Sequence, residues 1–141
     1  MSEDILYEIY HKDLKCFEIE EGFFGGWPNP PNKEQHRRIL ENSYKSLVAI
    51  DKRSNKIIGF INAISDGILS AYIPLLEVLP KYQKQGIGSK LVKRMLEELN
   101  DFYMVDLCCD ENLQSFYKKF DMIKSQAMIC RNYKYQRGRD L

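Results

Sequence analysis

The sequence predicts one α/β (α+β) domain, with a mixed, mostly antiparallel sheet that contains a central parallel pair of strands and carries helices on both faces. Two apolar, β-branched runs joined by a polar turn predict a hairpin, and a later strand, helix, strand order predicts a parallel crossover. A switch to helical periodicity marks the strongest helix. With 141 residues, 44% of them hydrophobic, the chain is long enough for one ordinary core, so a single domain over residues 1–141 is expected.

The first part of the chain combines a short strand with irregular segments. Ile5–Ile9 has the apolar character of a strand, and the mixed stretch around Leu14 favours a short helix. The segment Gly22–Pro31 is too rich in glycine and proline to continue a helix and is predicted to be a loop. Asn32 is a typical N-cap residue, so a helix is expected from there to about Asn42.

The middle of the chain predicts three strands. Ser46–Ile50 and Lys56–Ile64 are the apolar runs of the hairpin. The run Leu69–Leu79 is almost continuously apolar, as expected for a strand that is covered on both faces. Pro74 lies inside this run and has no amide hydrogen, so a bulge or an unpaired position is expected there.

The last part of the chain alternates helices and strands. In Gly86–Leu99 apolar residues recur every third or fourth position, which predicts an amphipathic helix. Phe102–Cys109 is the next predicted strand, and its crossover from Leu69–Leu79 makes these two strands parallel neighbours. A short helix over Glu111–Phe120 and a last strand over Gln126–Tyr135 complete the prediction.

The charge balance and hydropathy exclude two classes of partner. The chain has 21 Lys and Arg residues against 20 Asp and Glu residues, so it has no overall field that would attract a long polyanion, and no nucleic acid is expected. No segment approaches the roughly 20 apolar residues of a membrane span. The first ten residues carry acids where a secretory signal carries bases. A cytoplasmic protein with no membrane partner is therefore expected.

The four cysteines do not form a recognisable framework. Cys16, Cys108, Cys109 and Cys130 include no pair with C-x-x-C spacing, so neither a metal site nor a disulfide scaffold is predicted. Cys108 and Cys109 are adjacent in an apolar run, where neighbours on a strand face opposite sides. They are interpreted as small buried hydrophobic residues.

A loop that contains glycines opens the strongest helix. Free backbone N–H groups at a helix start form an anion site, and glycines let phosphate oxygens approach the backbone. Between Val78 and Leu96 there are five basic residues and no acidic one; the bases are Lys81, Lys84, Lys90, Lys93 and Arg94. Each cation near a helix N-terminus costs the helix about 0.3–1 kcal/mol. A bound polyphosphate would offset that cost.

The spacing within this loop excludes two common nucleotide motifs and matches a third. Leu91 stands where a dinucleotide fingerprint needs its third glycine, and the P-loop pattern G-x-x-x-x-G-K-[ST] is absent. The sequence Gln83-x-x-Gly86-x-Gly88 instead resembles the pyrophosphate loop [RQ]-x-x-G-x-[GA] of the GNAT superfamily of acetyl-CoA-dependent N-acetyltransferases. As in that family, the loop follows a strand that ends in V-x-P.

A second segment carries the same resemblance one strand downstream. Phe116–Met122 is similar to the family's F-Y-x-x-x-G-F segment, with Asp121 in place of the usual Gly and Met122 in place of Phe. The resemblance implies a parallel pair of strands splayed apart for the cofactor. It also implies that residues 1–44 are a variable segment on the acceptor side, residues 45–133 the cofactor-binding core and residues 134–141 a basic tail.

The resemblance implies acetyl-CoA as cosubstrate, with no metal. Its pyrophosphate would lie on the amides from Gln83 to Ser89, its pantetheine arm would pair near Val78 and Leu79, and Phe116 would form a wall. The complete set of cofactor-binding residues that the resemblance implies is Val78, Leu79, Gln83, Lys84, Gln85, Gly86, Ile87, Gly88, Ser89 and Phe116.

Acetyl transfer needs a neutral amine, and an alkylammonium with a pKa near 10.4 provides very little of it at pH 7. A base or a water relay is therefore needed. Glu77 is the first candidate, because its position in the predicted strand puts it on one face with Ile73, Leu75 and Leu79, where desolvation raises a carboxyl pKa. Asp66, in the turn before that strand, is the second candidate.

Two further roles complete the predicted site. Tyr117 matches the residue that acts as general acid in the family, and a phenol stays protonated at neutral pH. Phe23, Phe24 and Trp27 are candidate substrate-binding residues, because loops that carry aromatic side chains often line pockets.

The predicted function is transfer of an acetyl group from acetyl-CoA to a primary amine of a small molecule or a protein, by direct attack, in a monomer or homodimer. One alternative is a catalytically silent module of the same fold that senses acetyl-CoA or binds a partner. Another is RNA binding through the tail, where bases are interleaved with aromatic residues. The tail residues concerned are Arg131, Tyr133, Lys134, Tyr135, Arg137 and Arg139.

Overall fold

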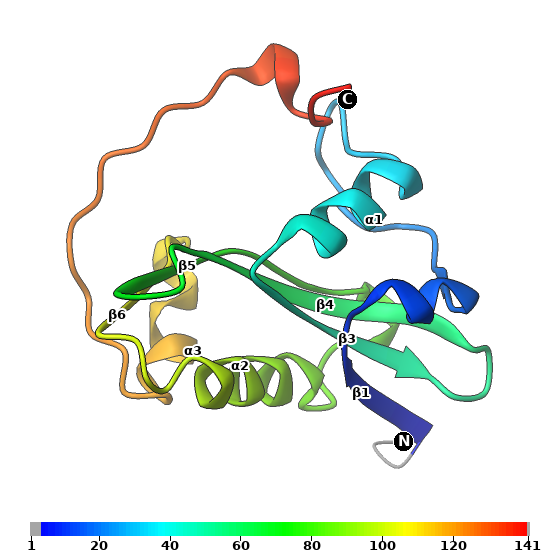
Figure 1. Cartoon of the computed structure of the whole chain (residues 1–141), viewed down its shortest axis with the longest axis horizontal. Helices are drawn as coiled ribbons and strands as arrows, with labels where there is room; N and C mark the ends of the chain where they lie inside the picture. The colour runs from blue at the N-terminus through cyan, green and yellow to red at the C-terminus, as the bar shows by residue number, and fades with distance from the viewer. Residues whose placement is uncertain (1–3, 141) are drawn as a thin grey trace.

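The computed structural model describes residues 4–140, which form one sheet with helices on both of its faces (Figure 1). The strands are β1 (Ile5–Ile9), β2 (Glu18–Ile19), β3 (Lys45–Asp51), β4 (Lys56–Ser65), β5 (Ser70–Val78) and β6 (Met104–Asp106). The α-helices are α1 (Lys33–Asn42), α2 (Ile87–Glu98) and α3 (Gln114–Lys118). Short 3-10 helices are η2 (Lys12–Cys16), η3 (Pro80–Tyr82), η4 (Glu111–Leu113) and η5 (Tyr133–Tyr135).

The sheet has the predicted mixed topology, except that the parallel pair lies at one end of the sheet and not at its centre, because the predicted last strand does not form. Its order is β1-β3-β4-β5-β6, all neighbours being antiparallel except β5 and β6, which are parallel. The short β2 pairs in parallel with β4. The parallel pairing runs from Ser70↔Met104 to Tyr72↔Asp106 and then stops, although β5 continues to Val78. The two strands therefore separate beyond these residues, as the family resemblance implies.

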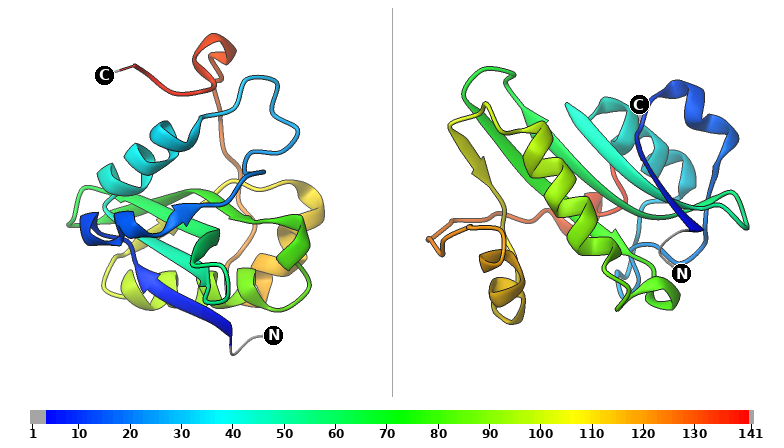
Figure 2. Two further views of the ribbon diagram at one scale, coloured as in Figure 1. Left: turned by 90° about the vertical axis from the view of Figure 1, so that its right-hand side faces the viewer. Right: turned by 90° about the horizontal axis from the view of Figure 1, so that it is seen from below.

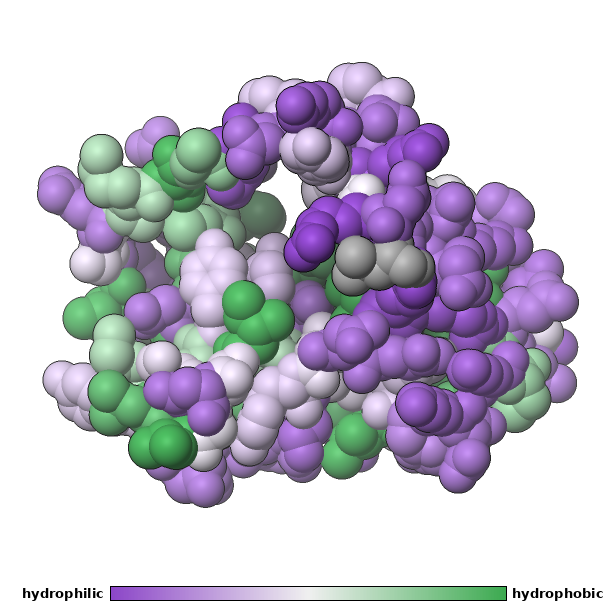
Figure 3. Space-filling model, turned by 45° about the horizontal axis from the view of Figure 1, so that its top comes forward, coloured by the Kyte–Doolittle hydropathy of each residue, from purple (hydrophilic) through white to green (hydrophobic). Residues whose placement is uncertain are grey.

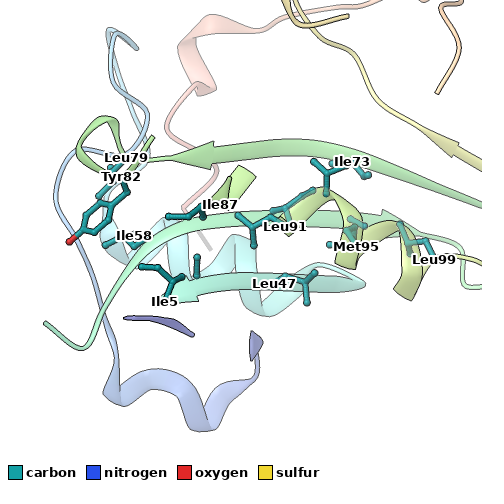
Figure 4. Packing of buried hydrophobic residues seen from close by; sticks show 14 of the residues in the cluster. Ile5, Leu47, Ile58, Ile73, Leu79, Tyr82, Ile87, Leu91, Met95 and Leu99 are labelled. Carbon is teal, nitrogen blue, oxygen red and sulfur yellow. The ribbon is translucent and has the colours of Figure 1, made fainter. Parts of the chain in front are cut away.

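Each face of the sheet is covered by one long helix (Figure 2). On one face, α2 packs against β3, β4 and β5, and Figure 4 shows Leu91, Met95 and Leu99 directed at Leu47 and Ile73 of the strands. On the other face, Leu40 of α1 packs with a second cluster of buried apolar residues. The N-terminal segment contributes further buried residues to this second cluster, so residues before β3 are part of the hydrophobic core of the domain.

The helix over residues 33–42 confirms its predicted cap. Asn32 has extended backbone angles, and its side chain accepts a hydrogen bond from the N–H of Gln35. The stretch around Leu14 forms the 3-10 helix η2, and the predicted helix over Glu111–Phe120 is divided between η4 and α3. Local capping and periodicity thus located these helices, while the boundaries depend on tertiary packing.

Pro74 lies in the bulge that its missing amide hydrogen predicted. In the β4–β5 pairing, Asn62 lies opposite Leu75 and Ile64 lies opposite Tyr72, so the single residue Ala63 faces both Ile73 and Pro74. A bulge of this kind changes which side of the sheet the following side chains face. Ile73 accordingly packs on the α2 side and Leu75 on the α1 side, which corrects the prediction that both share one face with Glu77.

The predicted last strand, Gln126–Tyr135, is wrong. Residues 121–132 carry no regular secondary structure, and Tyr133–Tyr135 form a 3-10 helix. An alternating apolar segment becomes a strand only where an edge accepts its backbone hydrogen bonds. In the described part of the chain this segment lies on no such edge, which leaves β6 at the end of the sheet.

Cys108 and Cys109 also differ from the prediction. The strand ends at Asp106, short of both cysteines, so Cys108 is exposed and Cys109 is only partly buried. The interpretation of these two residues as buried core is therefore wrong. They lie where β5 and β6 have already separated.

Candidate active site

The loop before α2 has the conformation of an open anion cradle. Gly86 is the N-cap of α2 with a φ of 81°, and Lys84 has a φ of 64°, both in the left-handed region. The first intrahelical bond runs from the N–H of Lys90 to the carbonyl of Gly86 at 3.1 Å. Within the described chain, the N–H groups of Ile87, Gly88 and Ser89 therefore have no partner, and they point out of the helix end.

This loop and the strand end before it enclose a cavity of about 230 Å³. A methyl group added to Gly86 would have no neighbour within 4 Å, and one added to Gly88 would lie 3.9 Å from Val78 Cγ2. The residues that line the cavity are Val78, Tyr82, Gln83, Lys84, Gly86, Ile87, Gly88, Ser89 and Phe116. Eight of the ten residues that the sequence assigned to the cofactor, all except Leu79 and Gln85, thus lie together.

Those two residues are placed differently. Leu79 is buried, and its N–H donates to the carbonyl of Ile58 at 3.0 Å, so this amide is already satisfied inside the protein. Gln85 is exposed and does not line the cavity. The carbonyl of Val78 accepts a hydrogen bond from the side chain of Gln83 at 2.9 Å, which ties the loop to the end of β5.

The five bases near α2 do not act as one cluster. Lys90 Nζ lies 5.1 Å from the centre of the Tyr7 ring, and the guanidinium of Arg94 lies over the same ring and donates to the Tyr7 carbonyl. These two side chains hold β1 against the helix. Lys84 lines the cavity and is the base best placed to meet an anion there.

A larger cavity of about 430 Å³ lies beside the separated ends of β5 and β6. Glu77 and Tyr117 both line it, although they are far apart in the sequence. The other lining residues come from the aromatic loop (Phe24, Gly25, Trp27), from β5 (Ile73–Leu76), from residues 107–110, from Leu113, and from Ile129 and Arg131 near the C-terminus. The separation of the strands thus creates the space that brings the two predicted catalytic residues together.

The carboxylate of Glu77 is held by the aromatic loop. Both of its oxygens lie 3.0 Å from the backbone nitrogen of Phe24, which donates to them. Burial raises the pKa of Glu77, while hydrogen bonds from the N–H groups of Phe24 and Gly25 act in the opposite direction. Phe24 has a φ of 61°, so the loop holds a left-handed residue at the point where it meets the carboxylate.

The phenol of Tyr117 stays protonated across the neutral range. Burial, with a smaller contribution from Cys109, raises the pKa of Tyr117 to about 12. Its ring packs edge-on against Phe116 with 4.9 Å between centroids, and Phe116 in turn contacts Phe120. The phenol can therefore donate a proton or a hydrogen bond into the cavity at neutral pH.

Two of the remaining candidates lie outside the larger cavity. Phe23 packs against His36 and Phe60 in the core, and only Phe24 and Trp27 of the three loop aromatics line the cavity. Asp66 accepts backbone hydrogen bonds from residues 68–70, which lower its pKa. It stabilises the turn between β4 and β5 and lines neither cavity.

Comparison with known proteins agrees with this geometry. The sequence profile of the Acetyltransferase (GNAT) family matches residues 6–122. The chain belongs to this family. The fold resemblance implied by the two motifs is thus confirmed, and the matched residues include both cavities except for Ile129 and Arg131.

The alignments with individual relatives cover nearly the whole of this GNAT chain. A protein from Deinococcus radiodurans R1 that is assigned as an acetyltransferase is 41% identical, with a TM-score of 0.88 over 98% of this chain and 95% of that one. The uncharacterized N-acetyltransferase ycf52 of Pyropia yezoensis is 26% identical over 94% of this chain and 78% of that one. A metagenomic aminoglycoside acetyltransferase solved with sisomicin is 21% identical over 94% and 97%, with a TM-score of 0.60, and shows the same fold.

Two general properties follow for residues 4–140 of this GNAT chain. No helix in this range is long and apolar enough to cross a membrane. Within the same range, no three His, Cys, Asp or Glu side chains are grouped to hold a metal ion.

Proposed function

We propose that this protein is an N-acetyltransferase that transfers an acetyl group from acetyl-CoA to a primary amine by direct attack. One observation carries the proposal. Val78 and Phe116 line the cavity at the α2 loop, and their immediate neighbours in the chain, Glu77 and Tyr117, line the larger cavity. A molecule bound by its phosphates at the loop would therefore reach the candidate acid and base with its other end.

The chain fits a polyphosphate at this loop. The three unpartnered N–H groups at the start of α2 can donate hydrogen bonds to phosphate oxygens, and Gly86 and Gly88 leave the approach free of side chains. Lys84 supplies a positive charge at the same cavity. Acetyl-CoA bound there would supply a thioester, the activated carbonyl of the reaction.

Glu77 is proposed to remove the proton that the amine must lose. An acceptor amine arrives mostly as ammonium at neutral pH, and a half-buried carboxylate with a raised pKa is a better base than an exposed one. The amine nitrogen then forms a bond to the thioester carbon, and the bond from that carbon to sulfur breaks. The ammonium loses its first proton to Glu77, directly or through a water molecule, and Glu77 passes it to solvent. The second proton leaves the nitrogen as the amide forms and restores the one that the departing thiolate takes from Tyr117.

Tyr117 is proposed to donate a proton or hydrogen bond to the departing thiolate. Its pKa of about 12 keeps the phenol protonated at neutral pH until the thiolate departs. The adjacent ring of Phe116 lines the loop cavity, so each of these two packed rings lines one of the two cavities, which supports this role.

The acceptor is proposed to bind against Phe24 and Trp27, in the part of the larger cavity that the N-terminal segment forms. The aminoglycoside acetyltransferase with the same fold was solved with sisomicin, which is a reason to include aminoglycosides among the amines tested. A panel should also contain amino acids, polyamines and peptides with a free amino terminus or a lysine.

The test follows CoA release with this panel and verifies the acetylated product by mass. Tyr117→Phe keeps the ring, so we expect unchanged acetyl-CoA affinity and a turnover lower by about 100- to 10,000-fold, the usual loss when a positioned acid is removed. Tyr103→Phe is the matched control, because Tyr103 is exposed and lines neither cavity.

Turnover of Tyr117→Phe at the rate of the parent would contradict the proposed role of this residue. Acetyl-CoA binding by the parent without turnover on any amine of the panel would instead favour the catalytically silent module. Such a module would need the α2 loop but neither Glu77 nor Tyr117.

A further inference from the structure

Residues 122–132, here named the C-terminal arm, run in extended form (Figure 1), and of these residues Ile129 and Arg131 line the larger cavity of their own chain. From residue 122 to residue 131, no backbone group is hydrogen-bonded to another backbone group of the described chain. Ile123, Met128 and Ile129 are 89%, 99% and 64% exposed. Ordering an extended segment costs about 1–2 kcal/mol of entropy per residue, and this arm forms no backbone hydrogen bonds in the described chain that would offset the cost. The arm therefore needs a surface outside its own chain.

Both ends of the arm are fixed. It leaves α3 through a turn in which the N–H of Asp121 donates to the carbonyl of Lys118. Beyond it, the side chain of Gln35 in α1 donates to the carbonyl of Arg139 at 2.6 Å, and the N–H of Asn29 donates to the side chain of Gln136. Figure 1 shows the arm running outside the body between these ends, and Figure 3 shows apolar surface on that side of the molecule, beside a hollow.

The structure also contains a strand edge without a partner. The N–H of Met104 donates to the carbonyl of Leu69, so the backbone groups of Met104 point toward β5. Successive residues of a strand direct their backbone groups to alternate sides, so those of Val105 point to the other edge. Among the described strands none lies there, because β6 ends the sheet. Such edges pair readily with a strand from another chain.

The arm and this edge have opposite charges. Residues 101–111 around β6 contain four acidic residues and no basic one, namely Asp101, Asp106, Asp110 and Glu111. Residues 122–139 contain five basic residues and no acidic one, namely Lys124, Arg131, Lys134, Arg137 and Arg139. In a two-fold symmetric pair of chains, each basic arm would meet the acidic edge of the other copy, so one contact would be made twice.

We propose that the C-terminal arm of one chain adds as a strand to the free edge of β6 in a second copy, and that the second copy does the same in return. The occupant of the edge is thus a second copy of this chain. The pairing gives the arm the hydrogen bonds that its own chain does not provide and covers its apolar side chains. It does not depend on the proposed acetyl transfer, because it concerns a surface and is tested by mass.

The first experiment measures the molar mass of the full chain by light scattering during gel filtration. We expect a dimer, twice the 16.6 kDa of one chain. Ala127→Pro and Met128→Pro each remove one backbone N–H, and because neighbouring N–H groups point to opposite sides, at least one of the two should give a monomer. Neither breaks a hydrogen bond within the chain, since these groups have no partner there. Ala127→Ser and Met128→Ala are the matched controls and should remain dimeric.

The second experiment reverses the charges. One variant carries Lys124→Glu and Arg131→Glu, and the other carries Asp101→Lys and Asp106→Lys. Each alone should dimerise at least about tenfold more weakly than the parent, because like charges meet at both contacts. Mixing the two should restore a dimer that contains one chain of each kind.

A monomeric parent at all concentrations would overturn the proposal, as would a dimer that both proline variants retain. A dimer between two arms would also overturn it. In that case the variant with lysines at positions 101 and 106 would dimerise as well as the parent.

Discussion

Two glycines of the loop before α2 lie two residues apart but should respond oppositely to the same substitution. Gly86 has a φ of 81°, in the region where any side chain is strained. Gly88 is a helical residue of α2 without a positive φ, and an added methyl group would meet Val78 Cγ2 and Phe116 Cζ at 3.9 and 4.0 Å, which are ordinary contacts. We therefore compare Gly86→Ala with Gly88→Ala.

The expected magnitudes follow from these conformations. A left-handed alanine costs about 1–2 kcal/mol, whereas alanine in place of glycine in a helix gains up to about 1 kcal/mol. For a chain of 141 residues the entropy of unfolding makes 1 kcal/mol equal to about 3 °C in Tm. Gly86→Ala should therefore lower Tm by about 3–7 °C. Gly88→Ala should leave it unchanged or raise it by up to about 3 °C.

Thermal unfolding with and without acetyl-CoA tests both the strain and the proposed site. At a ligand concentration of about 100 Kd the parent should gain about 2.7 kcal/mol. The loop pattern that the sequence matches admits Gly or Ala at position 88, so Gly88→Ala should keep most of this gain. In Gly86→Ala the strained residue stands at the helix N-cap, and a tenfold weaker affinity would reduce the gain to about 1.4 kcal/mol.

Equal Tm losses for the two variants would refute the conformational reasoning. An undiminished ligand gain in Gly86→Ala, with its Tm lowered as expected, would instead show that acetyl-CoA binds away from this loop. The two readings are independent, because one is taken without ligand and the other as a difference on adding it.

Three further predictions concern single side chains. His36 is 2% exposed, and burial lowers its pKa to about 4. The stability that the neutral imidazole provides above pH 6.5 should therefore be lost as the pH falls to about 4. In thermal melts across this pH range, His36→Phe should reduce the loss of stability by about 3 kcal/mol. Burial raises the pKa of Glu77, so ionising this buried carboxyl group destabilises the fold as the pH rises above the ordinary pKa of a glutamate. The Tm of Glu77→Gln should therefore rise relative to that of the parent between about pH 4 and 7. A Tm difference that does not change with pH would contradict the direction of this pKa shift. Asp121 has a φ of 62°, so Asp121→Gly should raise Tm by about 3 °C in a thermal melt, and a lower Tm would show that the aspartate side chain stabilises the turn.

The hairpin, α2 and the α2 loop could be predicted because their signals are local. In β3 and β4 the apolar residues follow one another in short runs, and in α2 the apolar stripe returns at Leu91 and Met95. The loop motif likewise consists of Gln83, Gly86 and Gly88, which lie close together in the chain, so it could be predicted without knowing any distant contact. Each of these features is formed by residues that are close to one another in the sequence.

The failures have a common physical origin in partners that lie far along the chain. Gln126–Tyr135 has the composition of a strand, but the sequence does not show whether an edge within the same chain will accept it. Cys108 lines the larger cavity because residues 107–110 leave the sheet where β5 and β6 separate, and Arg131 lines it from the C-terminal arm. Their residue types carried no signal that predicted this position.

Glu77 illustrates how a local feature sets the position of a functional residue. Without a bulge, Ile73, Leu75 and Glu77 would all face one side of the sheet, and Ile73 faces α2. The extra residue opposite Ala63, at Ile73 and Pro74, shifts the alternation by one, so Leu75 packs on the α1 side instead. That side holds the aromatic loop, whose Phe24 N–H donates to the Glu77 carboxylate. A proline that is unsuited to a regular central strand thus turns the candidate base toward the segment that binds it.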